Sequence, residues 1–180
     1  MSLRSYLAEN NQVAVIACVV VLLLAVLLIL LNLRGGTPYA ETKWMYDLNT
    51  KQLVVATIDT ISPDDSGGGA FDYGPLGSAG SVVDAFVYAC GDPTGPKEGM
   101  TQEDLEAIDA KIAFIARYDP KGFESLTNPT EQNSGFAPNR LFSRPDAGQW
   151  FGENSGPGMQ LQIDTMPSCP DGGTAVLTRP

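Results

Sequence analysis

Histidine is absent from the 180 residues of this chain, and cysteine occurs only three times. Histidine is the commonest general base, transition-metal ligand and pH switch in proteins, so those roles would fall to other groups. Only Cys90 and Cys169 lie outside the N-terminal apolar segment, and two cysteines cannot supply a four-thiolate zinc site. Attachment of haem through C-x-x-C-H is excluded as well. We therefore expect no cofactor.

Motifs that carry chemistry and runs of basic residues are also missing. The sequence contains no G-x-S-x-G, no G-x-x-x-x-G-K-[ST], no C-x-x-C and no H-E-x-x-H. It has 11 Lys and Arg against 21 Asp and Glu, a net charge of −10. A chain this acidic repels nucleic-acid phosphates, so no nucleic-acid partner is expected. The sequence predicts a protein that is not an enzyme.

Charge, proline and glycine are absent from the stretch Val13 to Leu31, VAVIACVVVLLLAVLLILL. A helix that crosses the hydrocarbon layer needs about 20 apolar residues, and inside lipid all backbone groups must bond within the segment. The pattern predicts a transmembrane helix over 13–33 after a short N-terminus, 1–12. A cleaved signal peptide is the alternative, but it has a shorter apolar region of about 7–15 residues and a small-x-small site.

Basic residues are almost balanced on the two sides of this segment, with Arg4 before it and Arg34 and Lys43 after it. The positive-inside rule therefore gives almost no preference for either orientation of the segment. We expect a cytoplasmic N-terminus and an extracytoplasmic C-terminal domain in the cell membrane, because a long acidic domain can translocate whatever its charge. In an oxidising compartment Cys90 and Cys169 could form a disulfide. The α-carbons would have to lie within about 7 Å, which the sequence leaves open.

The remainder divides into a glycine-containing hinge, 34–43, and one domain, 44–180. We expect this domain to be α+β, with an antiparallel sheet of four to six strands and one helix packed on a face. Alternating or β-rich runs predict strands at 44–48, 52–58, 81–90, 159–166 and 174–178. An apolar stripe behind a Thr101 cap predicts the helix, over 101–118.

Two segments between these elements are candidates for binding. The glycine-rich stretch 62–80 is expected to be a loop, in which Asp59, Asp64, Asp65 and Asp72 are weak calcium candidates. Their spacing matches no calcium loop, so a solvated loop is the leading interpretation. The stretch 121–157 is expected to be a long loop that carries many aromatic residues. Trp150 and Phe151 in it are the candidates for contact with a protein partner.

The order of these features resembles a group of exported, single-span proteins of planctomycete-type bacteria. The likeness rests on the short polar start, one span, YDLNT at a hairpin, ACGD after a strand and a late CPDGG. It implies export and anchoring but no activity. Pro93 stands where that group would place a further cysteine, which puts a metal site in doubt.

Three functions remain open at this point. The leading hypothesis is a non-catalytic accessory or structural subunit of a membrane or envelope assembly, with the lipid bilayer and other membrane or envelope proteins as partners. A pilin-like filament subunit is the second, since Glu9 is fifth if the mature chain starts at Ser5. Arg4 replaces the leader glycine, and Gly35 to Pro38 would end the helix at the membrane. A carboxylate-rich domain that binds a ligand or calcium is the third.

Overall fold

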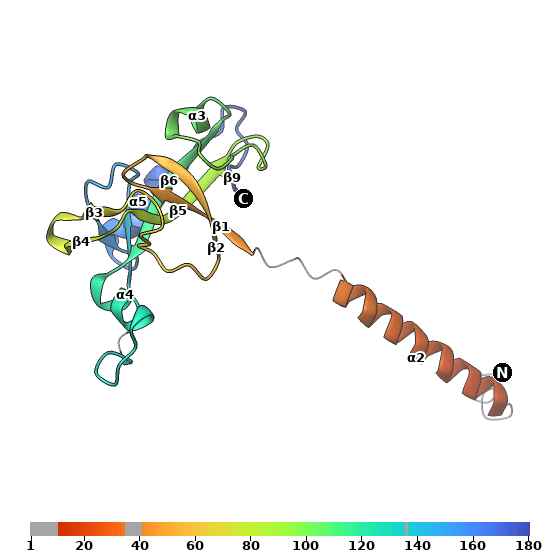
Figure 1. Cartoon of the computed structure of the whole chain (residues 1–180). Coiled ribbons are helices and arrows are strands. Elements are labelled where there is room, and N and C mark those ends of the chain that lie inside the picture. Colours follow the sequence, from red (N-terminus) through yellow and green to blue (C-terminus); the bar gives the residue numbers. More distant parts are fainter. Residues whose placement is uncertain (1–10, 35–40, 136) are drawn as a thin grey trace. The chain divides into compact units, whose positions relative to one another are not determined.

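The computed structural model describes residues 11–34, 41–135 and 137–180, and it divides the chain into two compact units, 1–39 and 40–180 (Figure 1). Most of the predicted N-terminal segment 1–12 and most of the predicted hinge 34–43 lie outside the described residues. The unit boundary falls within that hinge.

The first unit contains helix α2, Asn11–Arg34. The side chains described in it are those of residues 15, 16 and 19–28, which are aliphatic and exposed. Among the described residues, no helix is found that is both long and apolar enough to cross a membrane.

The second unit begins with the hairpin expected from the sequence. Strand β1, Thr42–Asp47, pairs antiparallel with β2, Gln52–Thr57, and Trp44 lies opposite Val55. The turn between them includes Lys51, whose φ is 57°. The β-rich composition on both sides of a polar turn was enough to identify this element.

Seven strands form the main sheet, which is more than the four to six expected. Strand β5, Val82–Ala89, lies between β1 and β6, Ala110–Tyr118, as expected for a central strand. The order continues through β7, Arg140–Ser143, to β8, Phe151–Gly152. All pairings are antiparallel, so the predicted α+β class with a small antiparallel sheet is confirmed.

The helix predicted over 101–118 is wrong for most of its length. Helix α3 covers only Gln102–Glu106, with the expected Thr101–Asp104 capping box, and Asp109 with φ 55° separates it from β6. Isoleucines in 108–115 recur at helical spacing, but residues 110–118 are almost all buried. A strand covered on both faces has no polar alternation, and β-branched and aromatic residues favour it.

The strand predicted over 159–166 is also wrong, because this segment is helix α5, Gly156–Thr165. Ser155 caps it, with its hydroxyl accepting from Gly158 N, and proline stands in the first turn. Helix α5 packs on β6, β7 and β8 and supplies the helical layer that the sequence assigned to 101–118.

The segments expected to be loops contain further elements. Within 62–80 lie β3, Ala70–Asp72, the 3-10 turn η1, Gly74–Leu76, and β4, Ser78–Gly80. Within 121–157 lie most of helix α4, Pro120–Thr127, as well as β7 and β8. The last strand β9, Val176–Leu177, pairs with β5 and not with the segment 159–166.

The sheet buries residues on both faces. One cluster gathers around Trp44, Val83, Val87 and Ile115, with the β3–β4 hairpin and Trp150 packed against it. The second cluster is aromatic, with Phe114 and Phe142 beneath Leu161 of α5. Two buried faces explain why the central strands lack the alternation of a half-exposed sheet.

Candidate functional site

A segment from outside the sheet separates the ends of its two central strands. The pairing of β5 with β6 reaches Asp84 opposite Ala116 and goes no further. Beyond that point Tyr118 N donates to Ser62 O at 3.0 Å, and Asp64 exchanges both backbone hydrogen bonds with Val82. The Ser62 hydroxyl also donates to Ala116 O at 2.9 Å. The chain at 62–64 thus holds the strand ends apart.

A pocket of about 630 Å³ lies beside this insertion. Its walls come from the segment 59–65, from the hairpin region around η1 and β4, from β6 and from α4. Ile61, Leu76 and Phe123 supply apolar surface. The charged groups are one cation, Arg117, and three acids, Asp59, Asp64 and Asp65.

Arg117 is the buried charge of this pocket, with a relative exposure of 2%. The centre of its guanidinium lies 3.9 Å from the centroid of the Tyr73 ring, and Nε donates to Tyr118 O at 3.0 Å. Nη1 is buried and has no hydrogen-bond partner among the described residues. Neither ion pair found in the described part of the chain includes Arg117.

The surroundings of Arg117 act on its pKa in both directions. Burial lowers the pKa of the guanidinium, while the fields of Tyr73 and Asp119 raise it. Burial also raises the pKa of Tyr73 to about 12, against the effect of Arg117. An arginine stays protonated in such a setting, so a full positive charge lies at the pocket wall.

Three of the four calcium candidates line this pocket, and the fourth does not. Asp59 and Asp65 are exposed and Asp64 is half-buried. Asp64 Oδ2 accepts from the Ser66 N–H at 3.0 Å and from its hydroxyl. Asp72 lies on β3, where its Oδ1 accepts from Gly74 N at 2.8 Å. The described residues hold no group of three or more Asp, Glu, Cys or His side chains arranged to bind a metal ion.

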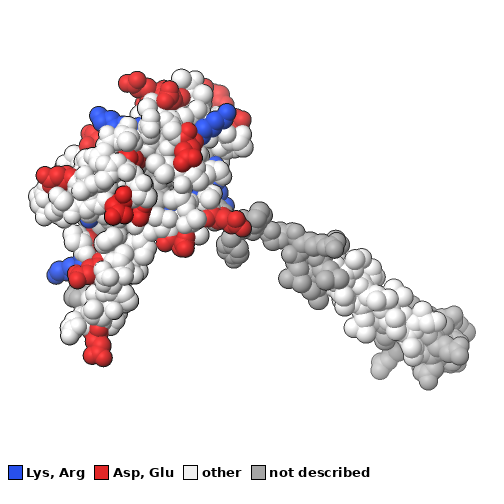
Figure 2. All heavy atoms as spheres, viewed as in Figure 1, with Lys and Arg blue, Asp and Glu red and all other residues white. Residues whose placement is uncertain are grey.

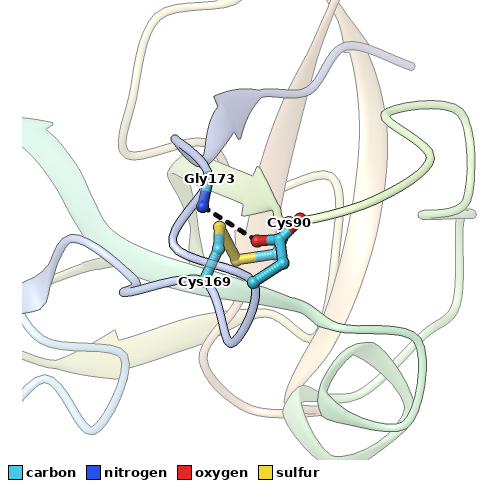
Figure 3. Close-up of a disulfide and its surroundings, with 4 residues drawn as sticks. Cys90, Cys169 and Gly173 are labelled. Atoms are coloured by element: carbon cyan, nitrogen blue, oxygen red, sulfur yellow. Dashed lines mark hydrogen bonds between the residues drawn. A yellow bond between two sulfur atoms is a disulfide. The ribbon is translucent and has the colours of Figure 1, made fainter.

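Cys90 and Cys169 form a disulfide, with an S–S distance of 2.11 Å and α-carbons 5.3 Å apart (Figure 3). The bond joins the end of β5 to the turn after α5, and Gly173 lies beside it. It closes a loop over a sequence separation of 79 residues. The sequence identified Cys90 and Cys169 as the candidate pair, but it could not establish the distance between their α-carbons.

The two candidates for partner contact pack within their own domain. The ring of Trp150 lies edge-on to Tyr73, with centroids 5.6 Å apart, and is half-buried against the first core cluster. Phe151 forms part of β8 opposite Phe142 and packs on the second cluster. Contact with a partner at these rings is therefore limited to their exposed edges.

Sequence reasoning missed Arg117 because it placed this residue in the last turn of a helix, where a cation is common. One signal could have identified it. In the run AKIAFIARY, once assigned to a central strand, Arg117 follows the five apolar residues 112–116. Buried charges are rare unless paired, so such a residue marks a candidate site.

No family model, curated protein or solved structure matches this chain. The site must therefore be interpreted from its own chemistry.

Proposed function

We propose that this protein is a non-catalytic accessory subunit of a membrane or envelope assembly, anchored by residues 13–33, with residues 44–180 outside the cytoplasm. The anchor rests on the uncharged run Val13 to Leu31, which falls within helix α2. A segment of this length and composition is stable in lipid, where its backbone bonds are all internal.

The observation that carries the proposal is the Cys90–Cys169 disulfide in the unit that follows α2. Disulfides persist in oxidising compartments and are rare in the cytosol. A disulfide-bonded domain after an apolar helix therefore supports a membrane anchor followed by an exported domain. On the face drawn in Figure 2, Asp and Glu are more widespread than Lys and Arg, and such a surface does not adhere to anionic lipid.

Membrane anchoring is tested with two matched variants of the full chain, expressed in bacteria and extracted with alkaline carbonate. Leu23→Arg with Leu24→Arg places two charges in the middle of the run, at a cost of about 3 kcal/mol each. We expect this variant to leave the membrane fraction, while Leu23→Ile with Leu24→Ile stays. Release of the wild-type chain by carbonate would refute the anchor.

Orientation is tested by adding protease to spheroplasts. With the proposed topology the domain is degraded in intact spheroplasts, and non-reducing gels show the oxidised form. Protection of the domain, with Cys90 and Cys169 open to thiol reagents, would place it in the cytoplasm and contradict the proposal.

The accessory role is tested by gentle-detergent extraction from native membranes, size determination and mass spectrometry. We expect an assembly larger than one chain, with other membrane or envelope proteins and an intact N-terminus. Cleavage after Arg4 with assembly into filaments would instead support the pilin-like alternative. A lone monomer would refute the accessory role.

A further inference from the structure

We propose that the pocket beside the 62–64 insertion binds a small zwitterionic ligand, whose carboxylate pairs with Arg117 and whose cationic group faces Asp64 and Asp65. This goes beyond an anchoring or accessory role, which needs no ligand. It assigns the pocket a chemistry that neither core packing nor the disulfide requires.

The argument for an anion begins with the burial of Arg117. Its relative exposure is 2%, its Nη1 has no partner among the described residues, and it belongs to no ion pair there. An unpaired charge taken from water is costly unless it is compensated. A guanidinium presents a planar fork of donors that matches a carboxylate in bidentate fashion.

The neighbours of Arg117 leave this role unfilled. The guanidinium carbon lies over the Tyr73 ring, 3.9 Å from its centroid, and this ring carries no net charge to pair with the cation. Asp119 raises the pKa of Arg117 through its charge, but it forms no ion pair with Arg117 in the described part of the chain, and its carboxylate caps α4 by accepting from Gly122 N. Arg117 Nε bonds to a backbone carbonyl, which carries no net charge.

The acids of the pocket determine which anion fits. Asp59, Asp64 and Asp65 line the same cavity as Arg117. Three carboxylates repel a phosphate dianion but stabilise an ammonium or guanidinium group on the ligand. A ligand with one carboxylate and one cationic group satisfies both ends.

The size and walls of the cavity also suit a small organic molecule. Its volume of about 630 Å³ lies within the range of about 300–1,000 Å³ that is usual for ligand pockets. The apolar side chains of Ile61, Leu76 and Phe123 can pack against an alkyl chain between the charged groups.

The test uses the full chain in detergent micelles, titrated by calorimetry with glycine, γ-aminobutyrate and ε-aminocaproate, which separate the two charges by increasing lengths. Butyrate and butylamine are the half-ligand controls, and protein-free micelles provide the baseline. We expect one aminocarboxylate to bind more tightly than either half-ligand. Absence of binding by every aminocarboxylate, or equal binding of butylamine, would overturn the proposal.

Variants identify the two ends of the site. Arg117→Met should weaken binding of the best aminocarboxylate by about tenfold or more, the value of a charge-assisted hydrogen bond. Arg144→Met is the matched control, since this exposed arginine lines a different pocket. Equal affinity of the two variants would refute a role for Arg117. If Arg117→Met fails to fold, Arg117→Lys takes its place in the test. This variant keeps the charge but loses the bidentate fork, so it should bind the aminocarboxylate more weakly than the wild type does.

Asp64→Asn with Asp65→Asn keeps the shape of the segment and removes two charges. It should weaken binding of the aminocarboxylate and strengthen binding of butyrate, because the two changes act on opposite ends of the ligand. A loss of both affinities in a variant that unfolds at the same temperature as the wild type would contradict the charge assignment.

The carboxylate could belong to a free amino acid or to the C-terminus of a peptide. The tripeptide Gly-Gly-Lys and its C-terminal amide distinguish these sources. Binding of the acid but not of the amide supports a peptide terminus, whereas binding of the free aminocarboxylates alone supports a small molecule. Equal binding of acid and amide would refute the pairing with Arg117.

Discussion

At the scale of single residues, Asp47 connects the first hairpin to the glycine-rich segment. It is 2% exposed, and its carboxylate accepts hydrogen bonds from Asn49 N, the Thr50 hydroxyl and Gly68 N at 2.8–3.0 Å. Burial alone raises the pKa of Asp47, but the nearby Ser81 hydroxyl and these bonds outweigh it, so the net shift is downward. The ionised carboxylate therefore contributes to holding this segment against the hairpin, through Gly68 N.

This arrangement predicts how stability depends on pH. A group whose pKa is lower in the folded state stabilises the fold above its unfolded pKa, about 3.9 for aspartate, and loses this effect as the pH falls through the folded value. Asp47→Asn should lower the free energy of unfolding by about 2 kcal/mol at pH 7. Urea titrations should show this difference shrinking below pH 4. A difference that does not change with pH would contradict the assignment.

A second acid, Asp84, is 8% exposed and lies between two cations. Its Oδ1 is 2.7 Å from Lys43 Nζ, and its Oδ2 is 2.9 Å from Arg140 Nη2. Asp84→Ala should destabilise the protein by about 3 kcal/mol in urea unfolding, because both cations lose their partner. The exposed Glu131→Ala is the control. The chain has a net charge of −10, so the loss of one acid also reduces the repulsion among its negative charges. If the Asp84→Ala variant were more stable than the wild type, this repulsion would outweigh the two ion pairs and the prediction would be wrong.

At the scale of elements, the two wrong assignments arose because the period of the sequence pattern did not match the element. Burial on both faces removed the alternation that distinguishes a strand, so β6 resembled a helix by its spaced isoleucines. In α5 the residues Met159, Gln160, Leu161 and Gln162 alternate by chance, although Met159 is 52% exposed and Leu161 is buried. The Ser155 cap and the proline after it were the local signals for a helix.

In helix α5, we expect a glycine-to-alanine substitution at residue 158 to destabilise the protein, although helix propensity favours alanine. Gly158→Ala should gain about 1 kcal/mol from propensity alone. A Cβ at Gly158 would lie 2.1 Å from Gly152 O, however, whereas one at Gly156 meets no atom within 4 Å. We expect Gly158→Ala to lower the midpoint of thermal unfolding and Gly156→Ala, in the same helix, to leave it unchanged or raise it. Equal effects of the two variants would refute the close approach of α5 to β8.

At the scale of the whole molecule, the disulfide closes a covalent loop with a sequence separation of 79 residues. It fastens the end of β5 near the segment that carries β9, which itself pairs with β5 at Tyr88 and Ala89. Cross-linking residues this far apart reduces the entropy of the unfolded chain by the equivalent of about 4 kcal/mol.

Cys90→Ser with Cys169→Ser should therefore lower the free energy of unfolding by about 2–5 kcal/mol. The measurement is urea unfolding of the full chain in detergent, and reduction of the wild type with a phosphine should give the same loss. A wild type whose stability is insensitive to reduction would contradict a structural role for the bond.

The sequence by itself determined what depends on local composition and local spacing. An apolar run of this length predicts a helix, and β-rich runs around a polar turn predict the β1–β2 hairpin. The Thr101–Asp104 pair predicts a helix start, and the segment 81–90 predicts a central strand. Each of these signals lies within one short, continuous stretch of the chain. The pairing of Cys90 with Cys169 was open at this level because the sequence contains no information on their separation in space.

Only the tertiary structure decided the rest. The second buried face of β6, the packing of α5 and the pairing of β9 with β5 depend on segments distant in sequence. So does the pocket, where the segment 59–65 enters beside β6 and brings three of the calcium candidates to a buried arginine. The burial of Arg117 depends on segments distant in sequence, among them the one that places Tyr73 against its guanidinium. No local pattern encodes it, because desolvation depends on everything that surrounds a charge.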